Sequence, residues 1–215
     1  MSRALNKPIC IAPYGVSFDR ERAIPFLLMI TSTHIVTNAL VALKEKGGAS
    51  QVLDSSAARW FVAGGLAPDF GLYALTAGAA VFFPLTRGMT VQESMHYAFS
   101  DLFFNDKGWV AIHNSLHSPV VLGALAAFGK LARKKSLVAF AKGCALHTAM
   151  DIPVHHNDGP LLFFPLDWKT RFDSPVSYYD KDHYGGIVAP IDFAITIVGS
   201  AAVLASWVKS RRRRS

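Results

Sequence analysis

Two long apolar stretches near the ends of this 215-residue chain restrict its fold more than any other feature. Residues 23–43 and 187–208 each hold about as many mainly apolar residues as a helix needs to cross a bilayer, about 20. Inside a bilayer the backbone must satisfy its own hydrogen bonds, and no segment shows the polar–apolar alternation of strands. The sequence therefore predicts an all-α helical bundle, membrane-embedded or membrane-associated, that forms one domain over residues 1–215.

Composition and charge support a membrane protein and argue against a nucleic-acid-binding one. Hydrophobic residues make up 51% of the chain and charged residues only 17%, against roughly 25% in an ordinary soluble domain. The net charge is +7, with basic residues clustered at 20–22, 130–135 and 211–214. These clusters flank apolar stretches, as cytoplasmic membrane anchors do, and the basic tail has no interleaved aromatics. Cys10 and Cys144 form no CxxC pair, so we expect free thiols.

Breaks in the pattern divide the chain into further elements. The first apolar helix carries a polar stripe that includes Thr31, Thr33 and His34, which suits packing against polar partners better than contact with lipid. The other expected elements are a helix from about 70 to 83 after a break near Asp69, an amphipathic surface helix over 90–104, a helical hairpin over 113–151, an ordered loop rich in proline and aromatics over 153–186, and a last helix over 187–208.

The positive-inside rule gives this layout an orientation. We expect the hairpin tip, the basic N-terminal segment 1–22 and the basic tail 209–215 to face the cytoplasm, with the loop 153–186 on the other side. The protein is then a multi-pass protein of a cell membrane, bacterial inner membrane by expectation, with a cytoplasmic C-terminus.

Histidine and aspartate recur at helical spacing in this apolar chain. His113 and His117 are four residues apart, as are His147 and Asp151, so each pair lies on one helical face. Imidazole and carboxylate are preferred ligands of zinc and similar divalent ions. With His34 and Asp69, the two pairs predict a site for one or two such ions.

Each of these residues also has an interpretation without metal. His34 could be a hydrogen-bonded core histidine, and Asp69 could cap the helix that follows it. His155, His156 and Asp158 could form a solvated turn. Because so many coincidences would be needed in a chain with few charges, we favour a metal site.

Three short motifs carry a resemblance to a known family. "APD" at 67–69, "HNSLHS" at 113–118 and "HTAMD" at 147–151 resemble the signature of the membrane-bound metal-dependent hydrolases, over roughly residues 30–186. The ligand order is also similar to that of zinc-dependent phospholipases C, although a later His-x3-Glu pair is missing. The resemblance implies the metal ligands His34, Asp69, His113 or His117, His147, Asp151, and His155 or His156.

The expected function is hydrolysis of a phosphoester, such as a lipid headgroup, by metal-activated water. Asp151 would bridge metals or accept a proton, and His155 and His156 would complete a second metal site or act as acid. Lys169 and Arg171 could hold a phosphate, although solvated surface charge is the simpler interpretation of both. The aromatic side chains of the loop would lie at a membrane interface: Trp168, Tyr178, Tyr179 and Tyr184. The alternative is a non-enzymatic membrane protein, or an accessory subunit, with a structural metal site.

Overall fold

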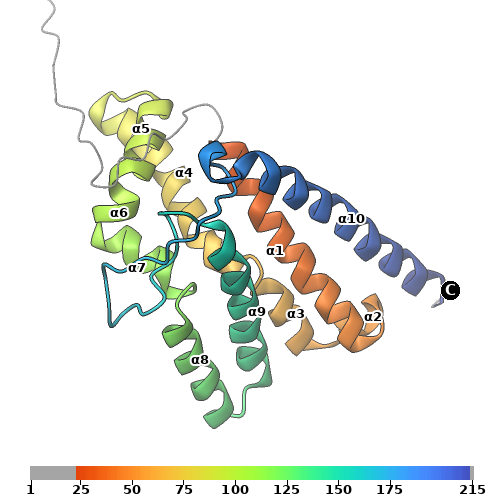
Figure 1. The fold of residues 1–215 in the computed structure, drawn as a ribbon. Coiled ribbons are helices and arrows are strands. Elements are labelled where there is room, and N and C mark those ends of the chain that lie inside the picture. The colour runs from red at the N-terminus through yellow and green to blue at the C-terminus, as the bar shows by residue number, and fades with distance from the viewer. Residues whose placement is uncertain (1–22, 214–215) are drawn as a thin grey trace, which may run out of the picture.

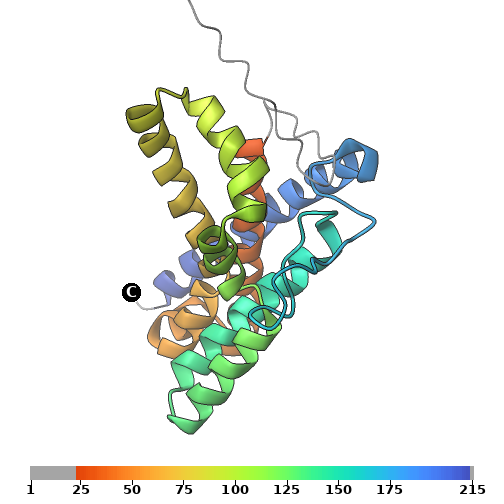
Figure 2. The ribbon, with the colours of Figure 1, turned by 90° about the vertical axis from the view of Figure 1, so that its left-hand side faces the viewer.

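The computed structural model describes residues 23–213, with side chains from residue 31 onward. Over this range it is a bundle of helices with no strand, as Figures 1 and 2 show, which confirms the all-α prediction. In chain order the α-helices are α1 (Ala23–Lys46), α2 (Ala49–Asp54), α3 (Ser56–Ala63), α4 (Ala67–Arg87), α5 (Val91–Tyr97), α6 (Phe103–Asn105), α7 (Lys107–Ser115), α8 (Pro119–Leu131), α9 (Lys135–Asp151) and α10 (Gly185–Arg212). A π-helical turn, Ala98–Leu102, joins α5 to α6, and short 3-10 helices cover Ile152–Val154 and Lys181–His183.

Three of these helices are long and apolar enough to cross a membrane. They are α4, the continuous segment Lys135–Val154, and α10. A fourth crossing is possible if α7 and α8, which meet at a bend of 53°, act as one broken span. Large apolar side chains such as Phe82 on α4 and Val198 on α10 are exposed, as expected of helices that face lipid.

The helices α1 and α10 pack side by side and run parallel. The Thr33 hydroxyl donates to the Asp192 carbonyl at 3.2 Å, and Gly199, further along α10, lies against Val36, further along α1. Both helices therefore start at the same end of the pair, as Figure 1 shows. The expectation that segment 1–22 shares one side of the membrane with the basic tail falls on residues outside the described range.

A close contact between small residues joins α3 to α9. A Cβ on Gly143 would lie 2.1 Å from the Phe61 carbonyl oxygen, and one on Gly64 would lie 2.7 Å from the Cys144 nitrogen. The Asn38 amide of α1 donates to the carbonyls of Phe61 and Gly143, at 2.9 and 3.1 Å. Part of the polar stripe on α1 therefore serves helix–helix contact, as small and amide residues do in membrane bundles.

The predicted start of the helix after the break, at about residue 70, is wrong in position. The helix α4 begins at Ala67, so Pro68 and Asp69 lie in its first turn, where proline needs no hydrogen-bond partner for its nitrogen. The N-cap is Leu66, and no side chain caps this helix, so Asp69 is free of the capping role.

The segment predicted as one surface helix over 90–104 is a continuous helix that contains a π-helical turn and packs against α4. Its N-terminus is capped by Thr90 and Glu93 in a reciprocal pair, and it then passes through the π-helical turn into α6. Phe99 and Phe103 are buried with Leu72 of α4. These aromatic side chains stabilise the α4–α6 arm, which lies at one end of the molecule, opposite the α8–α9 hairpin (Figures 1 and 2).

Candidate metal centre

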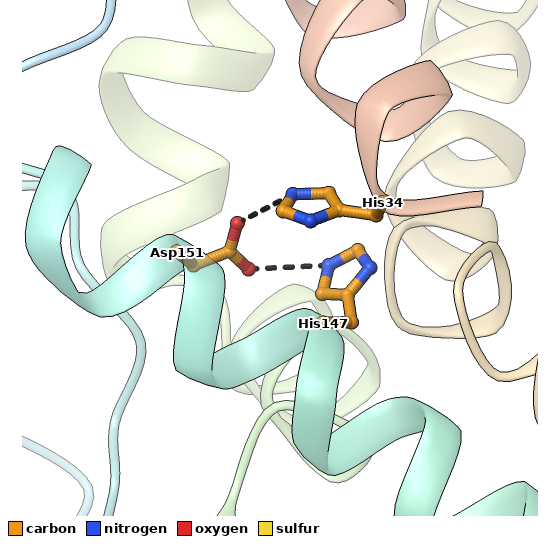
Figure 3. Close-up of side chains that lie close together, drawn as sticks. All are labelled: His34, His147 and Asp151. Carbon is orange, nitrogen blue, oxygen red and sulfur yellow. Dashed lines mark ion pairs between the residues drawn. The ribbon is translucent and has the colours of Figure 1, made fainter. Parts of the chain in front are cut away.

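Five side chains that can bind metal converge where four parts of the bundle meet. His34 comes from the middle of α1, Asp69 from the first turn of α4, His117 from the turn between α7 and α8, and His147 and Asp151 from the end of α9. Figure 3 shows three of them, with both Asp151 oxygens pointing at the imidazoles of His34 and His147. The helix α9 brings its pair together because residues four apart lie on one face.

The two oxygens of Asp151 face different histidines. Oδ1 lies 2.8 Å from His34 Nε2, whereas Oδ2 lies 3.1 Å from His147 Nε2 and 3.4 Å from His117 Nε2. Asp69 Oδ1 lies 3.4 and 3.5 Å from the Nε2 atoms of His117 and His147. The result is two overlapping ligand groups that share His147: His34, His147 and Asp151 on one side, and Asp69, His117 and His147 on the other.

These distances fit a metal site. With zinc–ligand bonds of about 2.0–2.1 Å in tetrahedral geometry, neighbouring ligand atoms lie about 3.3 Å apart. The Nε2 atoms of His34 and His147 are buried and lack a partner in hydrogen-bond geometry, although carboxylate oxygens lie close. A divalent cation would satisfy these buried nitrogens and neutralise the two carboxylates.

Backbone carbonyls fix the orientation of two of the histidines. His147 Nδ1 donates to the Gly65 carbonyl at 2.9 Å, and His117 Nδ1 donates to the His113 carbonyl at 2.6 Å. Because a carbonyl can only accept, each neutral ring keeps its proton on Nδ1 and turns the lone pair of Nε2 toward the cluster. Such a hydrogen bond from the ring nitrogen that does not face the metal is typical of metal-binding histidines.

Gly65 is needed where it lies. A Cβ there would come within 2.9 Å of the His34 carbonyl oxygen on α1, so only glycine lets the α3–α4 turn come this close to α1. The same closeness brings the Gly65 carbonyl to His147. The sequence pattern alone does not predict this contact, because the contact joins helices that are far apart in the chain.

The polar stripe of α1 also positions Asp69. The Thr31 hydroxyl donates to Asp69 Oδ2 and contacts the Tyr73 hydroxyl. Asp69 Oδ1 is thereby left to face His117 and His147.

His113 and His117 lie side by side but have different roles in the structure. The His113 ring is buried beside Phe103 and His117, with centroids 4.8 and 4.4 Å away, and belongs to neither ligand group. Its contribution is its carbonyl, which orients His117. Of the two histidines that the sequence left open, His117 is the one placed to bind metal.

The side chains of His155 and His156 point in different directions. His155 Nε2 lies 3.7 Å from Asp151 Oδ1, and His155 Nδ1 lies 3.2 Å from Asp158 Oδ2. His156 points away, toward Asp173 and the Ser174 carbonyl, because consecutive side chains of an extended segment project to opposite sides. The expected role of His156 in catalysis or metal binding is therefore not supported by its position.

The charge of His155 is set by its surroundings. Burial lowers its pKa, but Asp158 and Asp151 outweigh burial and raise the pKa to about 10. The two carboxylates therefore favour the protonated form of this ring.

The basic residues of the loop do not line the centre. The Arg171 guanidinium donates to the carbonyls of Gly159 and Phe103, at 3.0 and 3.2 Å, and stacks over the Phe103 ring. Lys169 is exposed. The expected phosphate-binding role of these two residues is not supported, because Arg171 anchors the loop instead.

Two polar residues of the "HNSLHS" motif, Asn114 and Ser118, have roles that the histidine pattern hid. The Asn114 amide oxygen accepts from the Leu161 backbone nitrogen at 2.7 Å. The Ser118 hydroxyl donates to the Phe164 carbonyl at 2.6 Å and accepts from the first backbone nitrogens of α8. The only available signal was Ser118 before Pro119, a typical helix start.

Comparison with known proteins adds no relative. No protein-family model matches the chain, and no curated protein or solved structure matches it either.

Proposed function

We propose that the protein is a membrane-bound metal-dependent hydrolase that cleaves a phosphoester, such as that of a lipid headgroup, with one or two zinc-like ions. The observation that carries this proposal is the convergence of three imidazole Nε2 atoms and two carboxylates within an apolar helical scaffold. The resemblance of "APD", "HNSLHS" and "HTAMD" to the membrane-bound metal-dependent hydrolases points the same way.

Each ligand has a defined task in this proposal. His34, His117 and His147 supply neutral nitrogens, while Asp69 and Asp151 supply negative charge. When bound there, a zinc-like ion lowers the pKa of water and acts as a Lewis acid toward a phosphoryl oxygen. Asp69 has the most exposed side chain of the five ligands, at 15%, so we infer that substrate approaches from its side.

His155 is the group that we place beside the substrate. Its Nδ1 lies near Asp158, and its Nε2 faces Asp151, next to the ligands but outside both ligand groups. We infer that His155 Nε2 donates a proton to the leaving-group oxygen, with Asp158 holding the ring in place. In this proposal the C-terminus is cytoplasmic and the membrane is the bacterial inner membrane.

A structural metal site is the second candidate, because the centre is so enclosed. The side chains of His34, His117, His147 and Asp151 are between 0 and 5% exposed. A closed site without an open coordination position is typical of structural zinc.

One experiment distinguishes the two candidates. The full-length protein, purified in detergent, is analysed for bound metal and assayed with a chromogenic phosphodiester and with phospholipids. We expect stoichiometric metal and chelator-sensitive hydrolysis that Asp151→Asn abolishes and His156→Ala, the matched control, retains. Bound metal with no hydrolysis of any substrate, together with a large fall in melting temperature on chelation, would favour the structural site.

A further inference from the structure

The loop between α9 and α10 presents large apolar side chains to the outside. Phe163, Leu166 and Trp168, which we call the loop tip, are 59, 80 and 45% exposed. Their neighbours Leu161 and Phe164 are 1 and 7% exposed and pack with Val110 of α7. The exposed apolar side chains of the loop tip therefore do not contribute to the buried core of this loop.

The loop tip is held in place by well-defined contacts. Asn114 binds the Leu161 nitrogen, and Ser118 binds the carbonyls of Leu162 and Phe164. Within the turn, the Leu166 nitrogen donates to the Phe163 carbonyl at 2.8 Å. Because these bonds fix the turn to the start of α8, a local collapse that hides the apolar side chains would cost several buried hydrogen bonds.

The length of the candidate span before the loop indicates where the loop tip lies relative to a membrane. The candidate span Lys135–Val154 has 20 residues and is therefore about 30 Å long, the thickness of a hydrocarbon core. If this segment crosses a membrane with the basic hairpin tip at one surface, its end, where the loop begins, lies at the opposite surface. Figure 1 shows the loop beside the bend between α7 and α8, at the start of the α8 arm.

We propose that the loop tip is a second membrane anchor, inserted into the bilayer interface on the side opposite the hairpin tip. Tryptophan beside lysine, as in Trp168 and Lys169, is typical of this interfacial layer, where a ring can bury its apolar part and a charged group can reach water. Tyr178, which we expected at the interface, is buried instead and does not contribute. This inference does not depend on the hydrolase activity.

Spin-label accessibility tests this anchor in the full-length protein, reconstituted in vesicles of phosphatidylethanolamine and phosphatidylglycerol. A nitroxide is attached at Leu166→Cys in a Cys10→Ser background, where the remaining Cys144 is fully buried. Val198→Cys on the exposed face of α10 is the lipid control, and Lys181→Cys in the exposed part of the loop is the water control.

We expect the label at position 166 to be relaxed by oxygen more than by a water-soluble nickel complex, as at position 198. Accessibility like that of position 181 would overturn the proposal, because the tip would then lie in water. Protection from both reagents would also overturn it, since a protein partner would then cover the tip. Leu166→Asp should shift the protein from vesicle-inserted toward aggregated material, whereas Lys181→Asp should not.

Discussion

At the scale of single residues, the two histidines of "HNSLHS" provide the sharpest test of the ligand set. His117 Nε2 faces both carboxylates, whereas His113 stacks on Phe103 outside the ligand groups. We predict that His117→Phe weakens zinc binding by at least about tenfold, because removal of a ligand should cost no less than loss of a second-shell partner. His113→Phe should leave the affinity nearly unchanged, because the His113 carbonyl remains. Competition with a chromogenic chelator measures both, and equal losses in the two variants would contradict this assignment.

The charge of Asp151 gives a second prediction at this scale. Asp151→Asn keeps the shape of the side chain but removes the charge that neutralises a cation. In a catalytic centre the variant should lose hydrolysis and keep most of its melting temperature. In a structural centre the same change should lower the melting temperature markedly, because metal-binding free energy is then folding free energy. Melting curves with and without chelator distinguish the two outcomes.

At the scale of elements, the contact between α3 and α9 supports the end of α9 that carries the centre. A Cβ on Gly143 would lie 2.1 Å from the Phe61 carbonyl oxygen, while one on Gly123 of α8 would meet nothing within 4 Å. We predict that Gly143→Ala lowers the free energy of unfolding by about 1–3 kcal/mol or more and weakens metal binding. Gly123→Ala, the matched control, should be neutral or stabilising by up to about 1 kcal/mol. Thermal unfolding in detergent measures this difference, and an equally stable Gly143 variant would rule out the close contact.

The elements also show what the sequence could and could not predict. Apolar length and helical spacing were enough to predict an all-α chain, a hairpin ending in "HTAMD" and a long loop before the last helix. The start of α4 was missed by three residues, because Pro68 suits a first helical turn as well as a break. The choice between His113 and His117 could not be made from spacing, since it depends on where the α7–α8 bend points each ring.

Sequence pattern was equally unable to predict the residues that support the metal ligands and their helices. Thr31, Asn38 and Gly65 each act through a partner more than 20 residues away, so no local pattern reveals their roles. His155 and His156 looked equivalent in sequence, and only the extended backbone at the end of α9 turns one toward Asp151 and the other toward Ser174.

At the scale of the whole molecule, the parallel α1–α10 pair makes a prediction about topology. Lys44 and Lys46 end α1 at the same end of the pair as the last basic turn of α10. We predict that cysteines placed after α1 and at the C-terminus are labelled from the cytoplasmic side, and that Lys181→Cys in the loop is labelled from the other. Cysteine labelling of inverted and right-side-out vesicles measures this. Labelling of the loop and the C-terminus from one side would contradict the layout.

The central claim is that five side chains from four parts of the chain form one metal centre. Metal analysis of the purified full-length protein tests it most directly, comparing wild type with His147→Ala, which removes the ligand shared by both groups, and with His156→Ala. We predict one or two divalent ions per chain in wild type and in His156→Ala, and almost none in His147→Ala. Wild-type protein that binds no divalent ion, even after incubation with zinc, or a His147 variant that binds as much as wild type, would contradict the account.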